Sequence, residues 1–93
     1  MDEVHSPPIR IYTLASCGYC WMAKRLLNEL GVAFEEIDVY NQPMLRAWIA
    51  DESGQRTVPQ TFVGDLSLGG YQELAELQRR GILSAVLAGE QEP

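Results

Sequence analysis

The two cysteines of this 93-residue chain, Cys17 and Cys20, stand three positions apart at a junction between two kinds of sequence. Residues 9–14, just before them, are rich in β-branched and aromatic side chains, which is typical of a buried strand. Behind them, apolar residues recur at helical spacing over residues 23–30. The fold must therefore carry a C-x-x-C pair at the point where a strand runs into a helix.

Thiol chemistry needs a thiolate, because the deprotonated sulfur is the nucleophile. A helix start is a suitable place for one. At a helix start, unpaired backbone N–H groups and the positive end of the helix dipole favour the anion of the first cysteine. Ser16 is a candidate N-cap for that helix. The pattern predicts a redox pair in which Cys17 is the attacking thiolate and Cys20, one turn further on, is the resolving thiol.

Other uses of the two cysteines have less support. A disulfide between residues three apart closes a loop too short to stabilise a secreted scaffold. Structural zinc needs four protein ligands, and the single histidine of the chain, His5, leaves such a site incomplete. A pair of inert helix cysteines stays an alternative. No obligatory metal is expected.

The charge balance limits the partners. Seven basic residues against 13 acidic ones give a net charge of −6, which argues against nucleic acid or an anionic membrane as the main partner. The apolar runs are too short for a transmembrane helix, and residues 1–8 lack the apolar region of a secretory signal. We therefore expect a cytoplasmic protein with one domain.

Turn residues divide the chain into alternating elements. Gly31 ends the first predicted helix, Asn41 is a candidate N-cap for the second, and Gly64-Asp65 marks a β-hairpin. Trp48 lies on the apolar face of the second helix and is expected in the core. The predicted order is strand, helix, strand, helix, hairpin and terminal helices. Strands are predicted at 9–14, 33–39, 60–63 and 66–68, within a domain at 9–88 that is flanked by a flexible arm (1–8) and a C-terminal tail (89–93).

Three motifs, taken in order, resemble the glutaredoxin family. They are Tyr12-Thr13 before Cys17-Gly18-Tyr19-Cys20, then Arg56-Thr57-Val58-Pro59-Gln60, then Gly69-Gly70-Tyr71. The resemblance covers nearly the whole of the predicted domain. It implies an α/β, thioredoxin-like fold, in which a four-stranded mixed sheet carries helices on both faces and a short helix lies at the C-terminus. It also implies that glutathione is the reductant.

The resemblance further assigns binding roles. Val58-Pro59 would be a cis peptide bond that turns the Val58 backbone toward an extended substrate. Gly70 allows close approach, and the helix start at Tyr71 and Gln72 offers N–H groups to the γ-glutamyl carboxylate. The residues predicted to bind glutathione or substrate are Tyr19, Arg46, Arg56, Thr57, Val58, Pro59, Gly70, Tyr71 and Gln72.

Two arginines match charged positions of the family, whereas three other residues depart from its usual pattern. Arg46 and Arg56 are the candidates for the glycyl carboxylate of glutathione. Many glutaredoxins carry proline where this chain has Gly18, and a lysine where it has Leu14. Gln72 stands where the family often has a small polar residue or aspartate, and it cannot pair with an ammonium group as aspartate could. These departures bear on the strength of glutathione binding.

The resulting hypothesis is a glutathione-dependent thiol–disulfide oxidoreductase. It would reduce protein disulfides with Cys17 and Cys20, and glutathione mixed disulfides with Cys17 alone. One alternative is a redoxin of the same fold that draws electrons from thioredoxin reductase or another low-molecular-weight thiol. Another is a dimer that binds a [2Fe–2S] cluster through two Cys17 thiolates and two glutathiones. The expected partners are glutathione and disulfide-containing or glutathionylated proteins, and the chain is expected to be a monomer.

Overall fold

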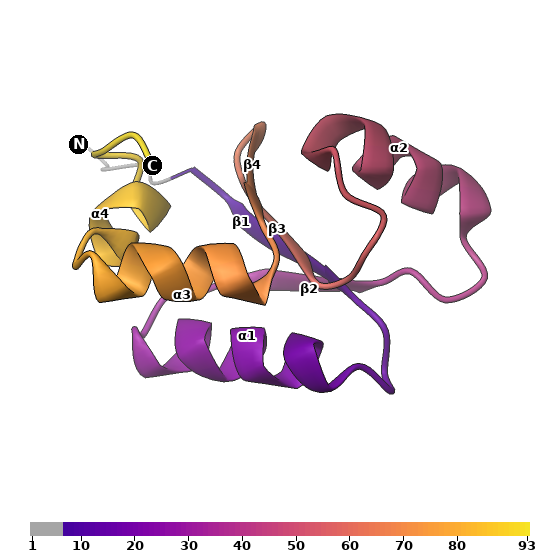
Figure 1. The fold of residues 1–93 in the computed structure, drawn as a ribbon, viewed down its shortest axis with the longest axis horizontal. Coiled ribbons are helices and arrows are strands. Elements are labelled where there is room, and N and C mark those ends of the chain that lie inside the picture. The colour runs from indigo at the N-terminus through magenta and orange to yellow at the C-terminus, as the bar shows by residue number, and fades with distance from the viewer. Residues whose placement is uncertain (1–6) are drawn as a thin grey trace, which may run out of the picture.

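The computed structural model describes residues 7–93, so most of the predicted arm at 1–8 lies outside the described residues. The strands and helices of the described part follow one another in the predicted order (Figure 1). Within residues 7–93, no helix has both the length and the apolar character needed to cross a membrane. The elements are β1 (Ile9–Thr13), α1 (Gly18–Glu29), β2 (Glu35–Asp38), α2 (Pro43–Ser53), β3 (Gln60–Val63), β4 (Leu66–Gly69), α3 (Tyr71–Arg79) and α4 (Leu83–Leu87).

The strands form one mixed sheet in the order β2-β1-β3-β4. β1 runs parallel to β2 and antiparallel to β3, and β3 pairs with β4 as an antiparallel hairpin. A parallel pair needs a crossover connection, which α1 provides, whereas a tight turn at Gly64-Asp65 is enough to join the hairpin. The predicted four-stranded mixed sheet is confirmed.

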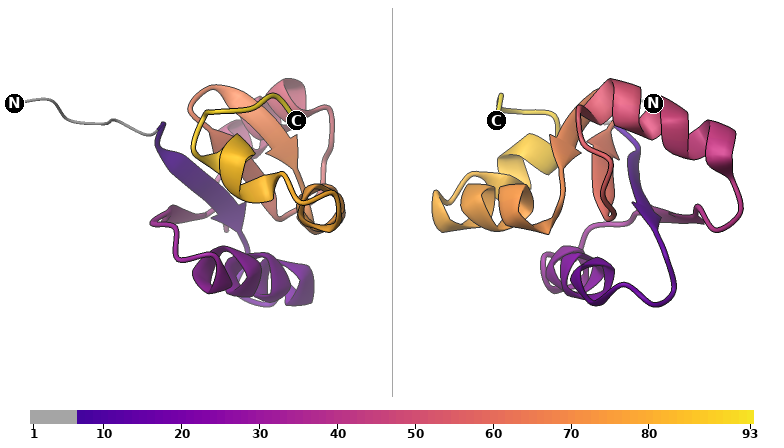
Figure 2. Two further views of the ribbon diagram at one scale, coloured as in Figure 1. Left: turned by 90° about the vertical axis from the view of Figure 1, so that its left-hand side faces the viewer. Right: turned by 45° about the vertical axis from the view of Figure 1, so that its right-hand side comes forward.

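Alternate residues of the central strands face two separate cores. Ile9 and Ile11 belong to the larger core, which includes buried side chains of α1, α3 and α4. Tyr12 and Phe62 belong to a smaller core on the opposite face, where α2 packs. Figures 1 and 2 show α1 and α3 on one side of the sheet and α2 on the other. The prediction of helices on both faces is therefore confirmed.

The expectation that Trp48 lies in the core is wrong. Its side chain is 41% exposed, although it stacks on Phe62 with ring centroids 5.5 Å apart and meets Tyr12 edge-on at 6.2 Å. Of the described helices, α2 is the one that covers this face of the sheet. The indole ring of Trp48 therefore has aromatic partners on one side and solvent on the other.

Candidate active site

Cys17 itself begins helix α1, one residue after the predicted cap. It is the N-cap residue, with an extended backbone, and its Sγ accepts a hydrogen bond from the N–H of Cys20 at 3.0 Å. The prediction that Ser16 caps the helix is therefore wrong. The N–H of Cys17 donates to the carbonyl oxygen of Leu14 at 3.1 Å, which closes the turn between β1 and α1. Helix N–H donors and the positive end of the helix dipole both favour negative charge on an N-capping atom.

The second sulfur has different surroundings. Cys20 is 1% exposed, whereas Cys17 is half-buried, and both are free thiols. Burial, followed by the contact with the Cys17 thiol, raises the pKa of Cys20 to about 12. The Cys20 thiol is therefore neutral and shielded, and the sulfur that a partner can reach is that of Cys17.

The peptide bond between Val58 and Pro59 is cis, as the resemblance implied. The Cys17 Sγ lies 3.6 Å from the carbonyl oxygen of Val58. The loop before β3 therefore passes close to the N-terminus of α1. Pro59 is buried and Val58 is half-buried at this point. The loop before β3 and the cysteine motif thus form one continuous surface.

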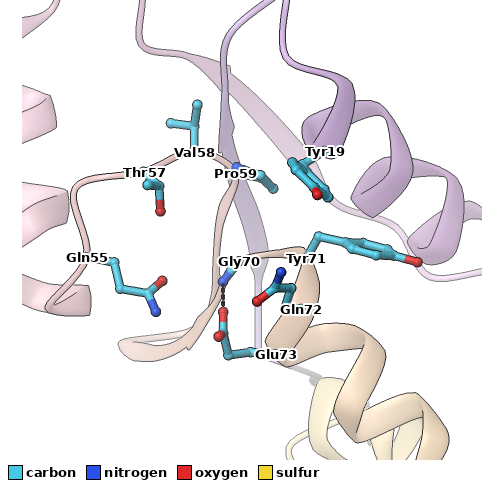
Figure 3. A pocket seen from close by; sticks show the side chains of 9 residues that line it. All are labelled: Tyr19, Gln55, Thr57, Val58, Pro59, Gly70, Tyr71, Gln72 and Glu73. Atoms are coloured by element: carbon cyan, nitrogen blue, oxygen red, sulfur yellow. Dashed lines mark hydrogen bonds between the residues drawn. The ribbon is translucent and has the colours of Figure 1, made fainter.

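A pocket of about 270 Å³ adjoins this surface (Figure 3). Its wall comes from the start of α1, the loop before β3 and the start of α3. The rings of Tyr19 and Tyr71 stack with centroids 6.2 Å apart, and so α1 and α3 meet at one side of the pocket. The lining residues are Tyr19, Gln55, Thr57, Val58, Pro59, Gly70, Tyr71, Gln72 and Glu73.

The lining includes most of the predicted binding residues but neither of the predicted arginines. Arg46 lies on α2 and Arg56 in the loop before β3; both are exposed, and neither lines the pocket. Gln55 and Glu73 line it without having been predicted. Glu73 stands three residues after Gly70, the spacing of a capping box, so this signal could have found it. No comparable signal marks Gln55.

Glu73 forms the end of the pocket at the start of α3. Its Oε1 accepts a hydrogen bond from the N–H of Gly70 at 2.6 Å, drawn as a dashed line in Figure 3. Gly69 makes room for this carboxylate, because its φ is +91° and a Cβ there would lie 2.7 Å from Glu73 Oε1. Among the described residues that line the pocket, Glu73 is the one acidic side chain, and no lysine or arginine joins it. The pocket is therefore negative at the α3 end and lined by neutral groups elsewhere.

The family model described as Glutaredoxin matches residues 9–67. The chain belongs to the glutaredoxin family. It is 46% identical over 82 residues to the glutaredoxin of Pseudomonas aeruginosa, a match that covers 88% of this chain and 98% of that relative. The solution structure of glutaredoxin from Brucella melitensis is 38% identical with a TM-score of 0.83, and the match covers 95% of this chain and 96% of that one. A crystal structure of a buckwheat glutaredoxin–glutathione complex is 30% identical with a TM-score of 0.83, covering 89% of this chain and 78% of that one.

Membership in the glutaredoxin family identifies the fold and the reaction class. The sheet and helices have the thioredoxin-like fold of these relatives, as predicted. The chain is accordingly a thiol–disulfide oxidoreductase, with Cys17 and Cys20 spaced as a C-x-x-C motif. Within residues 7–93, no group of three or more histidine, cysteine or acidic side chains is placed to hold a metal ion.

Proposed function

We propose that this glutaredoxin uses glutathione to reduce protein disulfides and glutathione mixed disulfides, with Cys17 as the nucleophile and Cys20 as the resolving thiol. The observation that carries the proposal is the contrast between the two sulfurs. The Cys17 Sγ caps α1 beside Val58 and the pocket, whereas Cys20 is buried and its pKa is raised. A disulfide partner can approach the first sulfur and not the second.

Removal of a glutathionyl group requires Cys17 alone. Its thiolate attacks the glutathione sulfur of the mixed disulfide, an S–S bond forms between Cys17 and glutathione, and the substrate thiolate leaves and takes up a proton. The thiolate of a second glutathione then attacks the glutathione sulfur held on Cys17. Glutathione disulfide leaves and the Cys17 thiolate returns. The incoming glutathione is the reductant: its sulfur enters the new disulfide in place of the substrate sulfur, which leaves as a thiol.

Reduction of a protein disulfide requires both thiols. The Cys17 thiolate attacks one sulfur of the substrate, forms a mixed disulfide and releases the other sulfur as a thiol. Cys20 then attacks the Cys17 Sγ and releases the second substrate sulfur. Cys20 gives up its proton as it attacks, and the departing substrate sulfur takes up a proton and leaves as a thiol. Two glutathione molecules in turn reduce the Cys17–Cys20 disulfide and leave as glutathione disulfide.

The pocket supports glutathione as the ligand. An extended peptide can pair with the backbone of Val58 as an added strand, and the first N–H groups of α3, at Tyr71 and Gln72, suit the γ-glutamyl carboxylate. A related glutaredoxin from buckwheat is known as a glutathione complex. In this proposal Tyr19, Thr57, Pro59 and Gly70 shape the wall around the peptide, and the exposed Arg46 and Arg56 attract the substrate at longer range.

The proposed setting follows from the same chemistry. A reducing cytoplasm maintains a pool of reduced glutathione and keeps the two cysteines as thiols between turnovers. The substrates are disulfide-containing or glutathionylated proteins, and the chain acts on them as a monomer. A donor other than glutathione would leave the Cys17 chemistry unchanged, so the choice of donor needs its own measurement.

Two cysteine variants test the division of labour. Cys17→Ser is expected to reduce both activities to the uncatalysed background, because no other accessible thiolate is available. Cys20→Ser is expected to keep deglutathionylation within about twofold of the wild type and to lose protein disulfide reduction. Both are measured by NADPH consumption with glutathione and glutathione reductase, using a glutathione mixed disulfide and a protein disulfide as substrates.

A parallel assay with thioredoxin reductase identifies the electron donor. Equal loss of both activities in the two variants would contradict the proposed roles of the cysteines. If the protein shows no activity with glutathione but is reduced by thioredoxin reductase, Cys17 would remain the proposed nucleophile and glutathione would be removed from the proposed function.

A further inference from the structure

Large apolar side chains at the start of α1 stay exposed beside the two cysteines. Trp21, directly after Cys20, is 59% exposed, and Met22 is 38% exposed. Tyr19, between the cysteines, is 56% exposed. A soluble domain that leaves neighbouring large apolar side chains open in this way commonly uses them to bind a partner. This part of α1 is therefore a candidate contact surface.

Two of these side chains line a groove between α1 and α3 that has a volume of about 330 Å³. The residues that line the groove are Trp21, Met22, Arg25, Leu26 and Glu29 of α1 and Tyr71 of α3. Tyr71 also lines the pocket described above, where its ring stacks on that of Tyr19 (Figure 3). The groove is therefore a second cavity that shares Tyr71 with the pocket and continues the surface around Cys17.

The charges that line the groove compensate each other. The Nε of Arg25 lies 3.1 Å from the Oε2 of Glu29, and its guanidinium carbon lies 5.5 Å from the centre of the Trp21 ring. Among the described residues, no other charged side chain lines the groove. A charged ligand group would lose water there without gaining an ion pair. The groove therefore suits an uncharged, apolar side chain.

The position of the groove along α1 sets its distance from the reacting sulfur. Met22 and Leu26 follow Cys17 along α1, and at 1.5 Å per residue they lie about 8 Å and about 14 Å further along the helix axis. An extended peptide covers roughly 3.3 Å per residue. A substrate held at Cys17 by its own cysteine therefore reaches the groove with a side chain roughly two to four residues away in its sequence.

We propose that the groove between α1 and α3 binds an apolar side chain of the protein substrate, in the segment that carries the disulfide or the glutathionylated cysteine. The inference rests on the proposed function, because it names a class of substrate for the same cysteine. A leucine, methionine or phenylalanine roughly two to four residues from the reacting cysteine fits the groove. The groove thereby selects among protein substrates, whereas the glutathionyl group occupies the pocket on the other side of Tyr71.

The test uses glutathionylated peptides in which one leucine moves along a sequence that otherwise contains glycine and serine. The leucine stands roughly one to six positions from the cysteine, on either side, so that it samples distances short of the groove and beyond it. Each peptide is assayed for kcat and KM with glutathione, glutathione reductase and NADPH. A peptide without leucine is the reference.

We expect a maximum in kcat/KM when the leucine stands roughly two to four residues from the cysteine on one side. The gain over the reference should be about tenfold, the effect of partly burying one leucine side chain. It should come from a lower KM with little change in kcat, because the contact lies away from the reacting sulfurs. The same kcat/KM at every position would overturn the inference.

Variants of the groove separate this site from a general preference for apolar peptides. Trp21→Ala and Met22→Ser should each remove most of the gain from leucine, and should keep turnover of the small mixed disulfide of cysteine and glutathione within about twofold of the wild type. Met44→Ser is the matched control, because Met44 is 86% exposed on α2 and does not line the groove. It should keep the preference for leucine. An equal loss of this preference in Met22→Ser and Met44→Ser would overturn the inference.

A trapped complex tests the contact with the groove itself unchanged. In Cys20→Ser, a mixed disulfide between Cys17 and the peptide has no resolving thiol and can be isolated. The chain has two tryptophans, Trp21 and Trp48, whose indole N–H resonances can be compared between the adduct of the best leucine peptide and that of the reference peptide. The resonance of Trp21 should differ between the two adducts and that of Trp48 should not.

The two proposals fail in different ways. If the Trp21 resonance is the same in both adducts, the groove does not hold the leucine, and this inference is overturned whatever the groove variants do. Turnover of the small mixed disulfide without a preference for leucine contradicts this inference alone. If the trapped adducts show the difference at Trp21 but glutathione supports no turnover, the proposed function is contradicted and the groove remains a substrate site.

Discussion

At the scale of single residues, the position of each sulfur on α1 decides its chemistry. Cys17 occupies the N-cap, where its side chain replaces the usual oxygen acceptor and stays partly open to solvent. Cys20 lies one turn further on, packed beneath the helix at 1% exposure. Two thiols of the same intrinsic reactivity thereby differ in access, since Cys17 is partly open to solvent and Cys20 is buried.

This asymmetry predicts site-selective alkylation. Iodoacetamide at about pH 7 should modify Cys17 in the reduced protein and spare Cys20, because a thiol with a pKa of about 12 stays protonated there. In Cys17→Ser the neighbouring sulfur is gone but burial, the larger cause of the raised pKa, persists. Alkylation of Cys20 should then accelerate only in strongly alkaline solution. Mass spectrometry of samples quenched across a pH series measures both rates.

The unfolded variant provides the reference for this prediction. In urea, Cys17→Ser exposes Cys20 as an ordinary thiol with a pKa of roughly 8.5, so its alkylation rate should rise at much lower pH than in the folded state. Equal rates in the folded and unfolded variant at about pH 7 would mean that Cys20 is not protected by its position in α1.

At the scale of the elements, Glu36 connects α1 to the edge of the sheet. Its Oε2, on β2, accepts a hydrogen bond from the Thr13 Oγ1 of β1 at 2.7 Å and lies 2.9 Å from the Nζ of Lys24 on α1. The hydroxyl of Thr13 first, and the ammonium of Lys24 second, lower the pKa of Glu36. One carboxylate thus joins two parallel strands to the helix that connects them.

The lowered pKa of Glu36 predicts how its contribution to stability depends on pH. A carboxyl group whose pKa is lower in the folded state stabilises the protein above its unfolded pKa, roughly 4.3, and loses that effect as pH falls through the folded pKa. Glu36→Gln should therefore lower the free energy of unfolding by up to about 1 kcal/mol at pH 7, since the pair is partly exposed. The difference from the wild type should shrink as pH falls below the unfolded pKa and vanish once pH has passed below the lowered folded pKa.

Urea unfolding at several pH values measures this difference, with Glu35→Gln as the matched control. Glu35 is the exposed neighbour on β2 and has no side-chain partner among the described residues. Its substitution should change the free energy of unfolding equally little at every pH. A loss of stability in Glu36→Gln that persists at acid pH would show that packing, and not the charge, is what Glu36 contributes.

Local signals were enough to predict the order of the elements and were less reliable at their ends. Gly31 ends α1 with a left-handed φ of 73°, as its position suggested. Asn41, in contrast, has a φ of 56° and Gln42 is the N-cap of α2, without a side-chain hydrogen bond. Gln55 was missed because its orientation depends on the buried Gln60, a contact that no helix or strand pattern encodes.

At the scale of the whole molecule, the candidate active site is assembled from three segments that lie far apart in the sequence. The start of α1, the loop before β3 and the start of α3 were each predictable as parts of one site, because all three carry motifs of the same family. The position of Arg46 was not predictable in this way. It lies on α2, which packs on the opposite face of the sheet from α1 and α3, and a motif in the sequence does not state which face a helix covers.

The net charge of −6 predicts opposite salt effects for acidic and basic substrates. Charge repulsion slows the encounter with an acidic disulfide peptide, and ions screen it, so kcat/KM should rise severalfold between about 0.01 M and about 0.5 M salt. For a peptide of the same length with lysines beside the disulfide, kcat/KM should fall over this range. Equal salt dependence for the two peptides would mean that local contacts, such as the carboxylate of Glu73, outweigh the overall field. Because both peptides meet the same Cys17, any difference in slope belongs to the encounter and not to the exchange reaction.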